Sequence, residues 1–213
     1  MPSLKIRRVD TSHPQAARQL AALKNPFAGQ ANVVAPSSRK LTQAVFGEAL
    51  PPVKVVERIC TDVRNKGLSA LLHYTEALDK VRLTPKQIRV HPEDLAAAYA
   101  EADPAFMDTA RRVRDNVLQF QVGLMSKDAL LPVSEHFELQ LRHRPLKRVG
   151  VCIPGGAAAY PSTLLMTVCP AQAAEVKEIV VVMPPTANGA NNRDMLAICH
   201  LLGVKEVYRV GGA

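Results

Sequence analysis

The sequence has 213 residues, of which 47% are hydrophobic and 22% charged, and its formal net charge is +8. This composition is ordinary for a soluble globular protein, and no run approaches the roughly 18 apolar residues that a membrane span needs. Trp is absent and only 4% of the residues are aromatic, so aliphatic side chains must form the core.

The chain start and the cysteines indicate a cytoplasmic protein. Residues 1–10 are basic, but no apolar segment follows them, so a secretory signal is not predicted. The four cysteines are widely spaced and form no CxxC pair, which argues against a zinc ribbon or a disulfide framework. They are Cys60, Cys152, Cys169 and Cys199.

The excess positive charge lies in the first 150 residues, with a cluster at Arg142, Arg144, Lys147 and Arg148. A basic half of a chain can bind nucleic acid. Here the basic residues are not interleaved with aromatic residues. The pattern therefore favours a solvated basic face, or one that attracts an anionic cofactor, over nucleic-acid binding.

Apolar spacing and capping residues predict helices up to about residue 129. Apolar residues fall on one helical face over 51–67, and a second helix is predicted over 69–78. Another helix starts at 91–94, and Asp103-Pro104 caps a long one that reaches about residue 122. Residues 87–90 are predicted to form one strand, and alternation over 137–141 predicts a half-exposed strand.

The pattern changes at residue 148. Strands are predicted over 148–153, 178–183 and 206–210, with helices over 161–174 and 192–202 between them. This order is βαβαβ, half of a doubly wound parallel sheet. We expect an α/β fold with a mainly helical region and a short strand pair over residues 1–147. An incomplete Rossmann-like parallel sheet follows over residues 148–213.

The middle strand of this sheet is apolar at every position from Ile179 to Met183, as in a strand buried on both faces. Right-handed crossovers place both connecting helices on one face. The amino-terminal helices could cover the second face. A chain that stops after a strand and a Gly-Gly turn more simply lacks its next helix, so we expect it to be truncated.

Two glycine turns follow strands of this sheet. One contains Pro154, Gly155 and Gly156, and the other is Gly211-Gly212. Open α/β sheets bind ligands at the carboxyl ends of their strands, and glycine lets a phosphate or a ring approach the backbone. These turns predict a ligand site, although neither is the GxGxxG dinucleotide motif.

Catalytic and metal-binding residues are not predicted. Cys152 is either a catalytic thiolate or a buried small hydrophobic residue, and its apolar strand favours burial. The histidines show no HxxxH or HxH spacing, so they predict no metal site. They are His13, His73, His91, His136, His143 and His200.

Residues 148–185, RVGVCIPGGAAAYPSTLLMTVCPAQAAEVKEIVVVMPP, resemble the block that opens the nucleotide-binding domain of the histidinol dehydrogenase family. Residues 203–213 continue the resemblance. Upstream, 63–67, 72–79 and 114–120 are similar to the family's helical segments. The resemblance covers about residues 50–213.

The resemblance implies an oxidoreductase of histidine biosynthesis that converts L-histidinol through the aldehyde to L-histidine, with two NAD and one zinc. It places Pro154 and Pro184 in the nicotinamide-nucleotide pocket and Cys152 where the family usually has a Tyr. Gln121 and Leu68 are further departures, at positions where a His and an Asp are common.

The resemblance also implies that the catalytic Glu-His pair, the zinc ligands and a cofactor-binding Gln lie beyond Ala213. The expected cofactor-binding residues are therefore Cys152, Pro154, Gly155, Gly156, Pro184, Gly211 and Gly212. We expect the 213-residue chain alone to be inactive and the full-length form to be a homodimer, without nucleic-acid or membrane partners.

Two alternatives stay open from the sequence. The first is a small NAD- or nucleotide-binding module without chemistry. The second is an interaction protein that uses its basic amino-terminal half to bind an acidic partner or nucleic acid. Saturable NAD binding favours the first, and salt-dependent retention on a polyanion favours the second.

Overall fold

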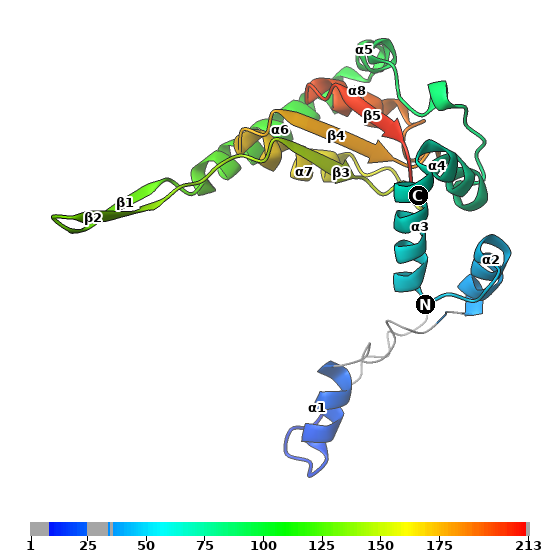
Figure 1. Ribbon diagram of the computed structural model, residues 1–213, viewed down its shortest axis with the longest axis horizontal. Coiled ribbons are helices and arrows are strands. Elements are labelled where there is room, and N and C mark those ends of the chain that lie inside the picture. Colours follow the sequence, from blue (N-terminus) through cyan, green and yellow to red (C-terminus); the bar gives the residue numbers. More distant parts are fainter. Residues whose placement is uncertain (1–8, 25–33, 35, 212–213) are drawn as a thin grey trace. The chain divides into compact units, whose positions relative to one another are not determined.

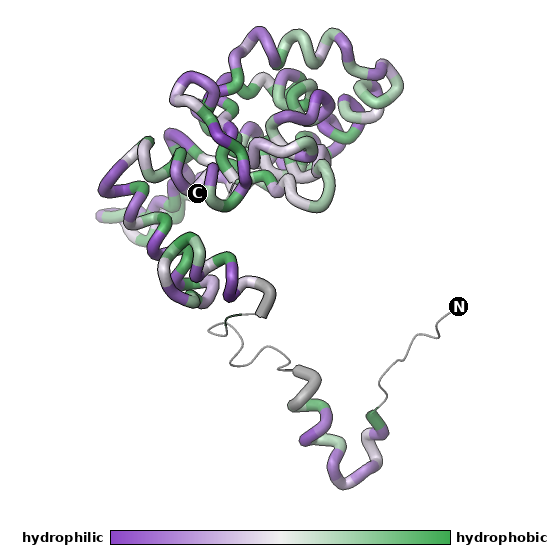
Figure 2. Tube along the Cα trace, turned by 90° about the vertical axis from the view of Figure 1, so that its right-hand side faces the viewer, coloured by the Kyte–Doolittle hydropathy of each residue, from purple (hydrophilic) through white to green (hydrophobic). Residues whose placement is uncertain are grey.

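The computed structural model describes residues 9–24, 34 and 36–211, and its contacts divide the chain into two units, residues 1–61 and 62–213. The first unit contains α1 (Ala16–Lys24), α2 (Pro36–Phe46) and the larger part of α3 (Pro52–Lys66). Figure 2 shows hydrophobic and hydrophilic residues alternating along the helical coils, as expected of amphipathic helices.

The second unit begins with helices. They are α4 (Leu68–Tyr74), which continues into a π-helical turn (Thr75–Asp79), then α5 (Pro92–Glu101) and α6 (Pro104–Leu124). As predicted, Asp103 caps α6, because its carboxylate accepts a hydrogen bond from the Ala105 N–H at 3.0 Å. Lys80, at φ 58°, follows the π-helical turn in the left-handed conformation.

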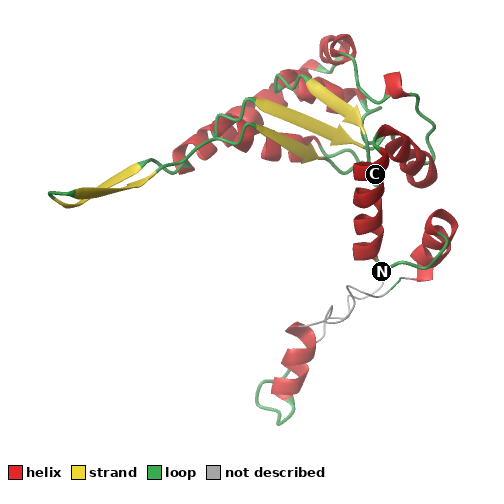
Figure 3. Ribbon diagram, viewed as in Figure 1, coloured by secondary structure: helices red, strands yellow, loops and turns green. Residues whose placement is uncertain are grey.

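The strands form two sheets (Figure 3). An antiparallel hairpin consists of β1 (Ala129–Ser134) and β2 (Phe137–Leu141). A parallel sheet in the order β3-β4-β5 consists of β3 (Arg148–Cys152), β4 (Glu178–Met183) and β5 (Glu206–Arg209). Helices α7 (Pro161–Ala173) and α8 (Arg193–Leu201) connect its strands. The predicted βαβαβ order is therefore confirmed.

Helices α7 and α8 cover one face of the parallel sheet (Figure 1). Helix α5 packs on α8, and α6 packs on α7. The core between the sheet and the helices is aliphatic, as expected. Its fully buried side chains include Leu164, Val168, Val181, Met183, Met195, Ile198 and Val207.

The opposite face of the sheet remains partly open. On β4, Val181 and Met183 are fully buried, whereas Val180 and Val182 are only partly buried. The strand is thus buried mainly on the side of α7 and α8, although its sequence is apolar throughout.

Three local expectations differ from the structure. Residues 87–90 form one antiparallel bridge, Arg89 to Tyr208, after a 3₁₀ turn at Pro85–Gln87. β2 is exposed along its whole length rather than on one face, because it pairs with β1 outside the parallel sheet. Cys152 is exposed rather than buried, because strand alternation places it opposite the buried Val151.

Candidate functional site

The carboxyl ends of β3, β4 and β5 surround a cavity of about 360 Å³. Its lining comes from the turns after the three strands and from the π-helical turn. The lining residues are Asp79, Cys152, Ile153, Pro154, Gly155, Gly156, Val182, Pro184, Thr186, Val210 and Gly211. Six of the seven predicted cofactor-binding residues are among them, and Gly212 lies outside the described residues.

Pro184 is buried where the turns after the three strands meet. A Cβ atom added to Gly155 would lie 2.7 Å from Pro184 Cγ and 2.9 Å from Gly189 Cα. A Cβ atom added to Gly211 would lie 2.8 Å from Pro184 Cα and 3.0 Å from Asp79 Oδ2. These contacts are too close for any side chain, so the turns can pack together only because glycine is present.

Hydrogen bonds from the loop after β4 join it to the glycine turn after β3. The Thr186 hydroxyl donates to the Gly155 carbonyl at 2.6 Å, and the Asn188 side-chain amide donates to the Gly156 carbonyl at 3.2 Å. The wall of the cavity that contains Pro154, Gly155 and Gly156 is therefore held by the neighbouring loop.

Sequence reasoning missed Asp79 and Thr186 as lining residues. Asp79 ends the π-helical turn, far from the sheet in sequence, and no periodic pattern relates it to the glycine turns. Thr186 directly follows Pro184-Pro185. Its position after a strand of a parallel sheet is a signal that could have identified it, because such loops meet at one edge.

Cys152 is the exposed thiol of this cavity. Cys169 and Cys199 are buried in the core, and burial raises the pKa of both thiols, that of Cys199 to about 12. Since the thiolate is the reactive form, these two cysteines are poor nucleophiles. Cys60, in the first unit, is exposed but is not a lining residue.

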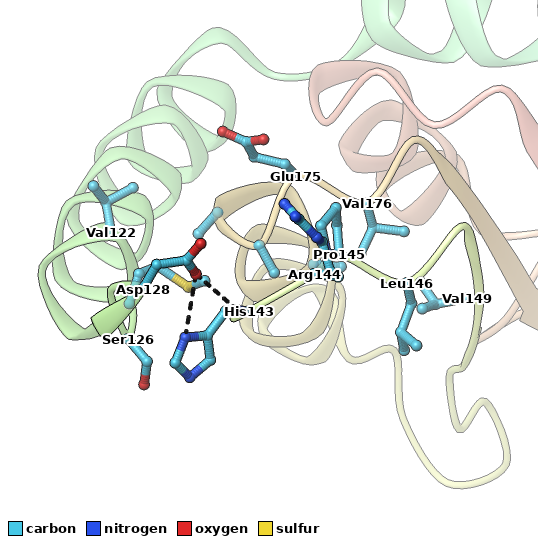
Figure 4. A pocket seen from close by; sticks show the side chains of 14 residues that line it. Val122, Ser126, Asp128, His143, Arg144, Pro145, Leu146, Val149, Glu175 and Val176 are labelled. Carbon is cyan, nitrogen blue, oxygen red and sulfur yellow. Dashed lines mark hydrogen bonds and ion pairs between the residues drawn. The ribbon is translucent and has the colours of Figure 1, made fainter. Parts of the chain in front are cut away.

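A second cavity, of about 650 Å³, lies near the amino end of the parallel sheet, between the last turns of α6 and α7 (Figure 4). Its polar feature is Asp128, whose carboxylate accepts a hydrogen bond from the His143 backbone N–H at 2.7 Å. This bond holds the pKa of Asp128 below its ordinary value. We favour the smaller cavity as the ligand site because parallel α/β sheets bind ligands at the carboxyl end.

Within residues 9–24, 34 and 36–211, no group of three or more His, Cys, Asp or Glu residues is arranged to hold a metal ion. No helix in the described part of the chain is long and apolar enough to cross a membrane.

Comparison with known proteins identifies the family. The family model of histidinol dehydrogenase matches residues 49–213, which is most of the chain. The chain belongs to the histidinol dehydrogenase family. The resemblance seen in the sequence is thereby confirmed, and so is membership of an oxidoreductase family of histidine biosynthesis.

Individual histidinol dehydrogenases match the chain over much of its length. The protein from Rhodopirellula baltica is 50% identical over 216 residues, which cover 100% of this chain and 47% of the relative. The protein from Listeria innocua is 40% identical over 159 residues, which cover 74% of this chain and 36% of the relative.

A solved structure also matches. The crystal structure of histidinol dehydrogenase from Elizabethkingia anophelis aligns with a TM-score of 0.69 at 30% identity, covering 77% of this chain and 37% of that chain. This chain thus spans less than half the length of the histidinol dehydrogenases that it matches.

Proposed function

We propose that the cavity at the carboxyl ends of β3, β4 and β5 binds part of the NAD cofactor of a histidinol dehydrogenase. The observation that carries this proposal is the convergence of six predicted cofactor-binding residues on one cavity. Membership of the histidinol dehydrogenase family supports the choice of a nicotinamide cofactor.

The residues at the cavity fit a nucleotide. The Gly155 and Gly156 backbone carries no Cβ atom, so a flat ring or a phosphate can approach it closely. Pro154 and Val182 add apolar surface, and about 360 Å³ has room for part of a dinucleotide. Bound NAD supplies a hydride acceptor, while the residues of this chain bind and orient it.

Zinc does not fit the described residues in the same way, because they contain no grouped set of three metal-ligating side chains. The described residues do not form a cluster that could hold zinc, so the zinc implied by the family resemblance requires other ligands.

The proposed reaction of the whole protein is the oxidation of L-histidinol through the aldehyde to L-histidine with two NAD, by a cytoplasmic homodimer. The 213 residues alone are proposed to be inactive, since they correspond to less than half of each matched relative. We also propose that a domain boundary lies between residues 147 and 148.

Thiol labelling tests the cavity directly. An alkylating reagent is expected to modify Cys152 and Cys60, which are exposed, and to spare Cys169 and Cys199, which are buried. NAD is expected to slow the modification of Cys152 at least about fivefold, because a bound ligand excludes the reagent from the cavity. Peptide mass spectrometry over a time course measures each rate.

Cys60 is the internal control, since it is exposed but does not line the cavity. NAD should leave its labelling rate unchanged. Equal labelling of Cys152 with and without saturating NAD would overturn the proposed site.

A further inference from the structure

We infer that Thr186 and Asn188 are positioning residues that orient two backbone donors, the N–H groups of Gly156 and Ala157, for the nucleotide. The inference rests on the proposed nucleotide site and deepens it. It gives a role to the loop after β4, which contains only one residue of the predicted site, Pro184.

The first step is the pair of hydrogen bonds between the two turns. Thr186 and Asn188 donate to the carbonyls of Gly155 and Gly156, which are 31 and 32 positions earlier in the chain. The hydroxyl bond, at 2.6 Å, is short and partly buried. Two successive peptide groups of the glycine turn are therefore held from one side.

The planar peptide group fixes the direction of the N–H that follows each carbonyl. The carbonyl of Gly155 and the N–H of Gly156 belong to one planar peptide group, and the described residues contain no cis peptide bond. In a trans peptide these two groups point in opposite directions. Thr186 therefore directs the Gly156 N–H away from itself, and Asn188 does the same for the Ala157 N–H.

The N–H groups of Gly156 and Ala157 are available to a ligand. Among the described residues, neither the Gly156 nor the Ala157 N–H has a protein acceptor. Gly156 lines the cavity and is exposed. Adjacent backbone N–H groups in a turn are suited to the oxygens of an anion such as the pyrophosphate of a dinucleotide.

The fourth step is the rigidity of the supporting loop. The Ala190 N–H donates to the Pro184 carbonyl at 2.9 Å, and the Asn192 side-chain amide donates to the Ala187 carbonyl at 3.1 Å. Asn192 also caps α8 by accepting from the Met195 N–H at 3.1 Å. Thr186 and Asn188 thus belong to a loop that is fixed to both β4 and α8.

The test compares substitutions at Thr186 in the 213-residue chain. Thr186→Val removes the hydroxyl but keeps the branched shape, and is expected to weaken NAD binding about tenfold because one donor loses its orientation. Thr186→Ser keeps the hydroxyl and should bind within about twofold of the unsubstituted chain. Isothermal titration calorimetry measures both affinities.

The matched control is Thr109→Val. The Thr109 hydroxyl also donates to a backbone carbonyl, that of Ala105 at 3.0 Å, but on the exposed side of α6. This variant removes the same hydroxyl group outside the cavity and should leave NAD affinity unchanged. Asn188→Ala, at a less buried bond, is a second variant that decides the question if Thr186→Val does not fold.

Amide resonances provide a readout that a purely structural role would not change. In ¹H–¹⁵N spectra, NAD should shift the Gly156 and Ala157 signals of the unsubstituted and Thr186→Ser chains. The Gly156 shift should be lost in Thr186→Val, and the Ala157 shift in Asn188→Ala.

The outcomes separate the inference from the proposed function. If the unsubstituted chain binds no NAD, the proposed site and the inference both fail. If it binds NAD but the folded Thr186→Val and Asn188→Ala variants bind equally well, the inference alone fails. Weaker binding that Thr186→Ser restores supports it.

Discussion

At the scale of single residues, glycine serves two separate purposes in this chain. Gly67 and Gly203 have φ angles of +59° and +67°, and each adjoins a helix end where the chain takes a positive φ that favours glycine. Gly155 and Gly211 have no positive φ, but their backbones lie against Pro184 where a side chain would not fit. The second kind of glycine shapes the cavity.

This distinction predicts different effects of two neighbouring substitutions. Gly155→Ala should lower the free energy of unfolding by about 1–3 kcal/mol, because its Cβ would overlap Pro184 and Gly189. Gly156→Ala should change it by less than about 0.5 kcal/mol, because a Cβ there meets nothing within 4 Å. Urea unfolding measures both, and equal losses would contradict the close packing at Pro184.

At the scale of elements, the two faces of the parallel sheet are covered unequally, although the sequence of β4 is apolar on both faces. Val181 is completely buried against α7 and α8, whereas its neighbour Val182 is partly exposed and lines the cavity. Cys152 and Tyr208 pair with Val182 across the strands and share its face. The apolar sequence of β4 therefore does not reveal which face the helices cover.

The two valines provide a matched pair. Val181→Ala should lower the free energy of unfolding by about 2 kcal/mol, because two methyl groups leave a packed core and a cavity remains. Val182→Ala should cost less than about 1 kcal/mol, because part of that side chain is already in contact with water. Equal losses in chemical unfolding would mean that both faces of β4 are covered in solution.

At the scale of the whole molecule, the described residues line the cavity that we propose for the nucleotide, but they contain no grouped set of metal ligands. It also spans less than half of the histidinol dehydrogenases that it matches. The proposed binding of NAD and the expected lack of catalysis in this chain can therefore each be measured by itself.

We expect the 213-residue chain alone to form no NADH from L-histidinol, with or without added zinc, because it corresponds to under half of each relative. The absorbance of NADH measures the rate. The full-length Rhodopirellula baltica enzyme, 50% identical over the matched region, is the positive control. NADH formation by the chain above a protein-free blank would disprove this expectation.

Much of the site was predictable because its signals are local. A strand that ends in Pro-Gly-Gly, and another that ends in Gly-Gly, indicate the carboxyl edge of a parallel sheet as the candidate ligand site, and six of the predicted residues line one cavity there. Thr186 follows β4 at this same edge and could have been assigned in this way, but Asp79 could not. Asp79 reaches the glycine turns only through the folding of a distant segment, and no spacing rule connects it to them.

Sequence signals were enough to predict the βαβαβ order, the cap of α6 at Asp103, the aliphatic core and the family, because apolar periodicity, capping and turn residues act over a few positions. The folded chain was needed to show that Cys152 is exposed, that Pro184 is buried among glycines, and that Thr186 donates to the Gly155 carbonyl. These features depend on the register of the parallel strands and on the crossovers between them, which bring residues about 30 positions apart into contact.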